Sequence, residues 1–289
     1  MANGHEWAAG ARPRTLPAAV APVLLGTGAA AQLGAASVGR AVLAGVVALA
    51  LQVGVNFAND YSDGVRGTDV DRVGPMRLTA SGAARPGHVK AAAFAAFGLA
   101  ALAGLALVAV SAHWWLLAVG AAAILAAWFY TGGKRPYGYR GLGEVGVFVF
   151  FGLVATLGTT YTQAGRLSWP AWAGAIGTGL LACALLMVNN LRDIPTDALS
   201  GKRTLAVRLG DHRARIAYQW LVTLPILLGV ACAFVAPWSL LVVLLGAAVA
   251  VLVTAVRAGA RGIALVPVLA WTGMLQLGFG VLLGLGLAV

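Results

Sequence analysis

The sequence is dominated by apolar runs long enough to cross a lipid bilayer, and these runs restrict the possible folds more than any other feature. A helix that spans the hydrocarbon core needs roughly 20 mainly apolar residues. Of the 289 residues, 60% are hydrophobic and 10% are charged, which leaves too few polar groups to cover a soluble globule. We therefore expect an all-α membrane protein with nine transmembrane helices. The expected spans are residues 16–36, 41–62, 89–110, 114–131, 143–164, 171–192, 216–236, 238–256 and 264–287.

The positive charges predict the orientation of these helices. With nine spans, the N-terminus and every second loop share one side of the membrane, and only Arg40 and Arg166 among the 20 lysines and arginines fall on the other side. Basic loops are typically cytoplasmic, so we expect the N-terminus on the cytoplasmic side of the cell membrane. Residues 1–10 lack the pattern of a removable signal peptide. No basic soluble domain is expected, so the charge favours the lipid bilayer as a partner and argues against nucleic acid.

Acidic residues are rare and clustered. The chain contains nine of them, and two groups end the expected spans 41–62 and 171–192. A carboxylate within a span costs about 2.5–3.5 kcal/mol near mid-bilayer and less toward the interface, which indicates that bound cations compensate the charge. The two groups lie four spans apart and therefore face the same side. We expect two parallel four-helix repeats and a ninth helix, all within a single domain of residues 1–289.

Each acidic group forms a polar face when it is placed on a helix, because residues three or four apart are neighbours there. The first face comprises Asn56, Asn59, Asp60 and Asp63. The second comprises Asn189, Asn190, Asp193 and Asp197. Pro195 predicts that the second helix kinks or ends at that point.

The kinds of side chain in these groups predict which metal they bind. Oxygen ligands without His or Cys favour Mg²⁺, which prefers a few carboxylates together with substrate phosphates. Two carboxylate faces that share one cavity would repel each other without such a cation. The expected metal ligands are Asp60, Asp63, Asp69, Asp193 and Asp197.

Basic residues near the carboxylates indicate a diphosphate site, since Arg and Lys pair with phosphate oxygens. The residues expected to bind the diphosphate are Asn56, Asn59, Arg66, Arg77, Arg135, Asn189, Asn190, Lys202 and Arg203. The structural alternative is a set of interfacial ion pairs that cap helices, each of small energetic value. Capping accounts for one or two acids, but not for the four between Asp60 and Asp71 in a chain so poor in acids.

These motifs resemble the paired aspartate-rich motifs of the UbiA superfamily of intramembrane prenyltransferases. Within it, the likeness is strongest to the 1,4-dihydroxy-2-naphthoate polyprenyltransferases of menaquinone biosynthesis. The stretches that carry it are residues 11–17, 56–69, 77–82, 133–138, 141–144, 189–197 and 201–205. One departure concerns spacing: the superfamily often has three residues between the second and third aspartates of its first motif, whereas five separate Asp63 from Asp69. This leaves the role of Asp71 open.

The resemblance implies a UbiA-type fold and a Mg²⁺-dependent reaction. A polyprenyl diphosphate would lose its diphosphate, and the allylic cation would be attacked by the ring carbon of 1,4-dihydroxy-2-naphthoate that carries the carboxylate. Loss of carbon dioxide would then give demethylmenaquinone. The residues expected to be catalytic are Asp60, Asp63, Asp193, Asp197 and Lys134, with Lys134 near the acceptor carboxylate.

Two other functions stay open at this point. The same fold serves other acceptors, such as 4-hydroxybenzoate, and the aspartates would not distinguish them. A secondary transporter is the second alternative, because repeated halves with intramembrane acids also mark ion-coupled carriers. Such carriers usually bind near the midplane, whereas these acids lie at one membrane face. The sequence does not indicate the prenyl chain length or the oligomeric state.

Overall fold

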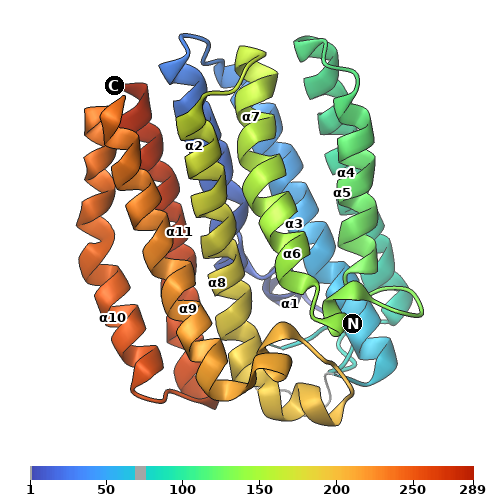
Figure 1. Cartoon of the computed structure of the whole chain (residues 1–289). Helices are drawn as coiled ribbons and strands as arrows, with labels where there is room; N and C mark the ends of the chain where they lie inside the picture. The colour runs from blue at the N-terminus through green and yellow to red at the C-terminus, as the bar shows by residue number, and fades with distance from the viewer. Residues whose placement is uncertain (1, 69–75) are drawn as a thin grey trace.

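The computed structural model describes residues 2–68 and 76–289, and the regular structure in these ranges is entirely helical. The helices lie side by side in one bundle (Figure 1). The first half contains α1 (Gly4–Gly10), η1 (Pro13–Thr15), α2 (Pro17–Gln32), α3 (Val38–Arg66), α4 (Pro86–Ser111) and α5 (Leu116–Phe129). The middle contains η2 (Tyr137–Arg140), α6 (Gly143–Val147), the π-helical η3 (Phe148–Val154), α7 (Ala155–Ala164) and α8 (Trp169–Leu199). The last part contains α9 (Leu205–Ala231), η4 (Cys232–Phe234), η5 (Pro237–Leu245), α10 (Gly246–Arg257), η6 (Gly262–Ala264) and α11 (Leu265–Ala288).

The prediction of a multi-pass, all-α membrane protein is confirmed. In the described part of the chain, 7 helices are each long and apolar enough to cross a membrane. The count rises to 8 if Gly4–Thr15 and Pro17–Gln32, bent by 50°, form one span. The helix Leu116–Phe129 is apolar but shorter. Every segment that the sequence marks as a span is therefore largely helical, and the protein is an integral membrane protein.

One half of the prediction made for Pro195, that the helix ends there, is wrong. Pro195 does not end its helix, because α8 continues to Leu199. Proline removes a single backbone donor, and the surrounding turns of this long helix persist. As a result Asp193 and Asp197 remain on one continuous helix.

Small residues bring the helices into close contact. A Cβ atom on Gly28 would lie 2.1 Å from the Gly284 carbonyl oxygen, and one on Gly280 would lie 2.4 Å from that of Ala21. The backbones of α2 and α11 therefore touch, as is common in membranes, where small residues permit close packing. This contact fixes α2 against the second half of the bundle.

The polar connections gather at one end of the bundle. Figure 1 shows the N-terminal residues and the connections after α3, α5 and α8 at the lower end, and the C-terminus at the upper end. We call this lower end the polar end and define it by residues 12–14, 59–68, 76–85, 130–142 and 189–204. At the opposite end, Arg40 donates hydrogen bonds to the carbonyl oxygens of Val110, Thr162 and Gln163. The Arg40 guanidinium thus ties the end of α4 to the end of α7.

Candidate active site

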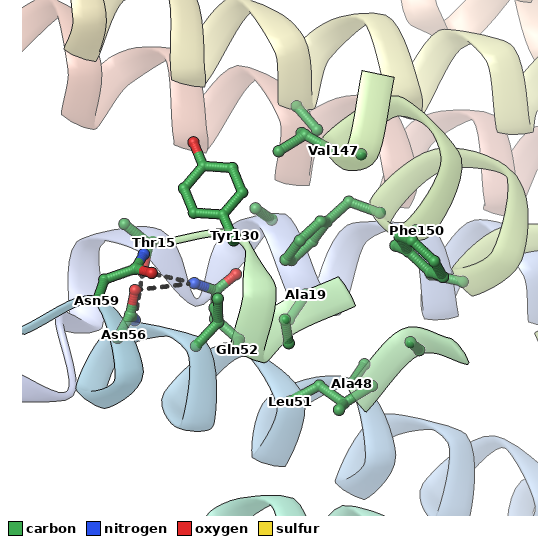
Figure 2. A pocket seen from close by; sticks show the side chains of 18 of the residues that line it. Thr15, Ala19, Ala48, Leu51, Gln52, Asn56, Asn59, Tyr130, Val147 and Phe150 are labelled. Carbon is green, nitrogen blue, oxygen red and sulfur yellow. Dashed lines mark hydrogen bonds between the residues drawn. The ribbon is translucent and has the colours of Figure 1, made fainter. Parts of the chain in front are cut away.

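A cavity of about 1030 Å³ opens among α2, α3, α4, α5, the α6–α7 helix and α8. Its lining is polar near the polar end and apolar along the rest of its length. Figure 2 shows the transition, with hydrogen bonds that link Gln52 to Thr15 and Asn56, and with Leu51 and Phe150 farther along. Such a shape suits a ligand with a charged head and a long apolar tail.

The first polar face, which lies on α3, contributes three of its four expected side chains to the cavity. Asn56, Asn59 and Asp63 line the cavity, but Asp60 does not. An α-helix turns about 100° per residue, so Asn56, Asn59 and Asp63 group within one narrow sector and Asp60 lies at its side. The four residues do not share one ligand face.

Asp60 instead holds a loop. Its Oδ2 accepts a hydrogen bond from the Leu78 amide at 2.8 Å, and its Oδ1 accepts one from the Thr79 amide at 2.9 Å. The side chain is fully buried, and each oxygen has a backbone partner. We expected Asp60 to be a metal ligand, but in the structure its carboxylate anchors the segment that begins at Leu78.

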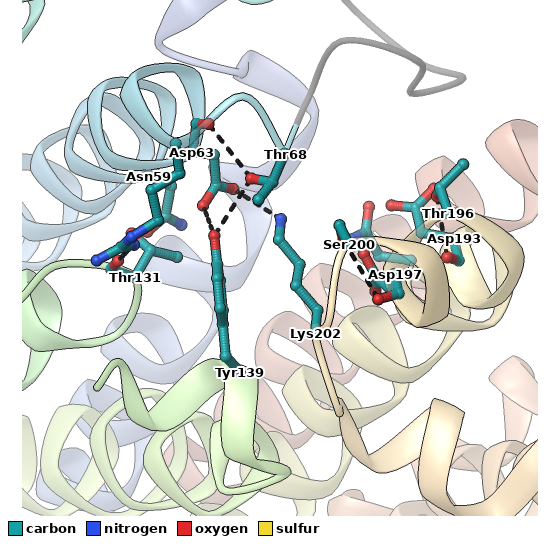
Figure 3. A network of polar contacts seen from close by, with 12 residues as sticks. Asn59, Asp63, Thr68, Thr131, Tyr139, Asp193, Thr196, Asp197, Ser200 and Lys202 are labelled. Carbon is teal, nitrogen blue, oxygen red and sulfur yellow. Dashed lines mark hydrogen bonds and ion pairs between the residues drawn. The ribbon is translucent and has the colours of Figure 1, made fainter. Parts of the chain in front are cut away.

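Asp63 lies where the cavity opens at the polar end. We call this part of the cavity the polar mouth and define it by Asn59, Asp63, Arg77, Asn189, Asp193, Asp197 and Lys202. Its Oδ2 is 3.3 Å from the Lys202 ammonium, and its Oδ1 accepts a hydrogen bond from the Tyr139 hydroxyl. The Lys202 Nζ also lies 4.8 Å from the centre of the Tyr139 ring. In Figure 3, Lys202 reaches toward Asp63 with Asp193 and Asp197 on its other side. Burial and the neighbouring Asp63 carboxylate raise the pKa of Tyr139 above its usual range, so the phenol keeps its proton and remains a donor.

The second polar face, which lies on α8, contributes all four of its expected side chains to the cavity. Asn189, Asn190, Asp193 and Asp197 line the cavity. Arg192 accompanies them: its Nε lies 2.7 Å from Asp193 Oδ1, and its terminal nitrogen lies 2.8 Å from Asp193 Oδ2 and 3.0 Å from Asn189 Oδ1. A bidentate arginine of this kind fixes the position and orientation of the carboxylate.

The cations expected at the diphosphate divide into two groups. Arg77 and Lys202 line the cavity. The others do not: the Arg66 guanidinium donates to the carbonyl oxygens of Thr131 and Gly133, and the remaining side chains are exposed outside the cavity. These exposed residues are Arg135 and Arg203, and Lys134, which was expected near the acceptor carboxylate, is exposed outside the cavity as well.

The turn after α5 explains why two of these basic side chains lie outside the cavity. Gly133 has φ 75°, a left-handed conformation that favours glycine, and the turn leaves Lys134 and Arg135 exposed. Lys134, expected near the acceptor carboxylate, therefore does not line the cavity in this structure. Residues close to a motif in sequence can thus lie outside the site that the motif forms.

Several cavity residues escaped the sequence-based assignment. Arg12, Arg14 and Tyr137 line the cavity as well. The Arg12 guanidinium donates to the Asn56 carbonyl oxygen at 3.3 Å. The basic residues and prolines of segment 11–17 carry part of the family likeness, but their pattern alone does not indicate that they line a cavity.

A buried acid supports the α8 face from behind. Glu144 Oε1 accepts a hydrogen bond from Asn190 Nδ2 at 3.3 Å, and the Glu144 side chain is buried. The amide nitrogen of Asn190 is thereby engaged, which leaves its oxygen for the cavity. No pattern in the sequence paired these two residues.

The donor set at the mouth fits Mg²⁺ only in part. Among residues 2–68 and 76–289, no group of three or more His, Cys, Asp and Glu side chains is close enough to hold a metal by itself. Asp69 and Asp71 lie outside the described residues. The oxygen donors of Asn59, Asp63 and the α8 face nonetheless suit a hard cation whose remaining ligands come from a diphosphate and water.

The chain resembles known proteins along most of its length. Residues 19–264 match the UbiA prenyltransferase family. A Mycobacterium tuberculosis protein named 1,4-dihydroxy-2-naphthoate octaprenyltransferase is 55% identical over 278 residues, which cover 96% of this chain and 94% of that protein. An Escherichia coli protein of the same name is 44% identical over 221 residues, covering 74% of this chain and 72% of that protein.

Solved structures share the fold. The structure of a UbiA homolog from Archaeoglobus fulgidus bound to DMAPP and Mg²⁺ superimposes with a TM-score of 0.69 at 15% identity. The match covers 95% of this chain and 97% of that chain. The UbiA fold is therefore confirmed.

Proposed function

The chain belongs to the UbiA prenyltransferase family, and from this premise we propose that it transfers a polyprenyl group to 1,4-dihydroxy-2-naphthoate. The donor is a polyprenyl diphosphate, and the product after loss of carbon dioxide is the prenylated naphthoquinol, which is the reduced form of demethylmenaquinone. The observation that carries the proposal is the cavity, which joins an aspartate-, asparagine- and arginine-lined mouth to an apolar interior. The acceptor follows from the relatives that are 55% and 44% identical.

The polar mouth binds the diphosphate. Arg77 and Lys202 lie there to contact the outer phosphate oxygens. Asn59, Asp63, Asn189, Asp193 and Asp197 are the residues that would hold Mg²⁺. When bound, Mg²⁺ neutralises the diphosphate and makes it a better leaving group.

The chemical step breaks the bond between the allylic carbon and the diphosphate oxygen. The bonding electrons leave with the diphosphate, and the preorganised cations at the mouth stabilise its developing charge. The acceptor ring supplies the electron pair for the new carbon–carbon bond, and carbon dioxide leaves from the same ring carbon, returning its bonding pair to the ring.

The aromatic lining protects the allylic cation. Tyr130 and Tyr137 line the cavity between the polar mouth and the apolar interior, and the faces of aromatic rings attract cations. Burial raises the pKa of Tyr137 to about 12, so this phenol stays neutral and presents no phenolate that could capture the cation. The charged groups are thus confined to the mouth.

We place the site on the cytoplasmic side of the cell membrane. Arg12, Arg14 and the basic loops gather at the polar end, as the positive-inside rule expects of a cytoplasmic face. In this arrangement α2 and the short α5 also cross the membrane, which makes nine spans in one domain. The two polar faces on α3 and α8 support two parallel four-helix repeats followed by a ninth helix.

The test is product formation by purified protein in lipid nanodiscs. The reaction contains Mg²⁺, a polyprenyl diphosphate, and either 1,4-dihydroxy-2-naphthoate or 4-hydroxybenzoate, and products are identified by mass spectrometry. A decarboxylated, prenylated naphthoquinol that disappears with EDTA is the expected result. Product from 4-hydroxybenzoate alone would overturn the acceptor, and flux across sealed vesicles without product would favour a transporter.

A further inference from the structure

The cavity extends far beyond the polar mouth. Along α3 its lining runs from Asp63 through Leu51 to Ala44. At 1.5 Å per residue, Ala44 lies roughly 28 Å from Asp63, close to the hydrocarbon thickness of about 30 Å. The cavity therefore reaches almost the full depth of the bilayer.

Three glycines on three helices lie around its deep part. Gly104 on α4, Gly120 on α5 and Gly158 on α7 all line the cavity. A Cβ atom on Gly104 would lie 3.9 Å from the side chain of Val47, which places Gly104 near the deep end of α3.

Hydrogen bonds between helices give the depth of the other two glycines. Thr131, just after α5, donates a hydrogen bond to Asn59 Oδ1 at 2.8 Å, so the end of α5 lies at the same depth in the bundle as Asn59. At 1.5 Å per residue, Gly120 lies roughly 16 Å farther from the polar end. Arg40 contacts the Thr162 carbonyl oxygen at 3.1 Å, which sets Gly158 about one helical turn from the level of Arg40. All three glycines therefore lie in the half of the cavity farthest from Asp63.

These glycines differ from those that pack helices together. A Cβ atom on Gly120 or Gly158 would meet no heavy atom within 4 Å, whereas one on Gly28 would lie 2.1 Å from a backbone oxygen. The missing side chains at Gly120 and Gly158 thus leave open volume and are not needed for helix contact. Larger residues there would occupy the cavity itself.

Among the described residues, the threonines that line the deep half of the cavity use their hydroxyls in hydrogen bonds to the backbone. Thr159 donates to the Ala155 carbonyl oxygen at 2.7 Å, and Thr162 donates to that of Gly158 at 2.8 Å. Their hydroxyls are used within α7. The surface that remains is apolar, which suits a hydrocarbon chain.

We propose that the deep half of the cavity holds the distal isoprene units of the donor, and that Gly104, Gly120 and Gly158 determine how long a donor this chain accepts. The proposal rests on the proposed function and adds a specificity determinant to it. A leucine at one of these positions would compete with the tail for the same volume. Short donors end before they reach this depth, so selectivity shifts toward them.

The experiment compares Gly120→Leu and Gly158→Leu with two matched controls. Gly45→Leu on α3 and Gly98→Leu on α4 are also helical glycines with no heavy atom within 4 Å of a new Cβ, but they do not line the cavity. Leucine is a better helix former than glycine, so all four variants retain their helices. We would measure kcat/KM with octaprenyl diphosphate and with geranyl diphosphate.

We expect the ratio of kcat/KM for the octaprenyl donor over the geranyl donor to fall by about tenfold to a hundredfold in both cavity variants, as overpacking predicts. The control variants keep the wild-type ratio. A wild-type ratio in the cavity variants would overturn the proposal and show that the tail leaves the cavity elsewhere.

Binding of unreactive thiodiphosphate analogues of both donors is measured in parallel, since this readout needs no acceptor. If the wild-type protein makes no product, the proposed function fails, but the analogue affinities still decide the inference. Equal loss of affinity for both analogues in Gly120→Leu and Gly158→Leu would contradict it.

Discussion

The polar faces of α3 and α8 resemble each other in sequence and differ in what they present to the cavity. On α8 all four expected residues line it, whereas on α3 Asp60 turns aside and binds the amides of Leu78 and Thr79. Helical spacing defines a broad face in both cases. Only the neighbouring segments decide which side chains at the edge of that face reach a ligand.

The two faces also differ in how their carboxylates are balanced. Asp193 pairs with the adjacent Arg192 on the same helix. Asp63 pairs with Lys202 and Tyr139, which come from distant parts of the chain. The Arg192–Asp193 ion pair therefore forms within one helix, whereas the partners of Asp63 are brought to it by the assembled bundle.

The largest effect should come from removing a carboxylate at the cavity on either helix. Asp63→Asn and Asp193→Asn should each lower kcat by about 10²–10³-fold, the usual loss when a preorganised electrostatic contact disappears. Steady-state rates with Mg²⁺ and both substrates measure this. A large loss in only one variant would show that the two faces do not act on one diphosphate.

The Asp60→Asn variant tests whether Asp60 anchors the segment at Leu78 and Thr79 or binds the metal. Hydrogen bonds to a charged group contribute about 1.5–3 kcal/mol, so this variant should unfold at a clearly lower temperature. Its kcat should fall much less than that of Asp63→Asn. The measurement is a thermal melt in detergent alongside the rate. Wild-type stability with abolished turnover would mean that Asp60 does act at the metal.

Tyr139→Phe removes one contact of Asp63 and nothing from α8. Loss of a single hydrogen bond of about 0.5–1.5 kcal/mol should lower kcat/KM by roughly threefold to tenfold. Because the pKa of Tyr139 is raised, its hydrogen bond is present below the ordinary tyrosine pKa of about 10 and is lost only above it. The ratio of wild type to variant should thus stay constant from about pH 6 to about pH 9. A ratio that falls within that range would show that the phenol ionises there.

Lys134→Ala should have the smallest effect. The side chain is exposed and does not line the cavity, and such surface changes are usually within about 0.5 kcal/mol. We expect kcat/KM within about twofold of wild type for both acceptor and donor. Lys202→Met is the matched comparison, because Lys202 lies in the mouth and its loss should be far more costly. An equal loss in Lys134→Ala would place that lysine in the site.

The membrane fold could be predicted from the sequence because apolar length alone distinguishes spanning helices. The α8 face was predictable from helical spacing as far as Asp193, whereas the continuation of the helix through Pro195 to Asp197 was not. The position of Asp60 was not, because its partners are backbone amides in a loop without a recognisable pattern. Arg12 and the Glu144–Asn190 hydrogen bond depend on contacts between distant segments, which a single sequence does not specify.

The most direct test of the two-helix site is Mg²⁺-dependent binding of an unreactive geranyl thiodiphosphate, measured by calorimetry with wild type, Asp63→Asn, Asp193→Asn and Asp60→Asn. We predict that Mg²⁺ strengthens binding to the wild type and to Asp60→Asn, and that this enhancement is lost in the other two variants. Loss of the enhancement in Asp60→Asn, or its survival in both Asp63→Asn and Asp193→Asn, would contradict the assignment of the diphosphate site to the cavity between α3 and α8.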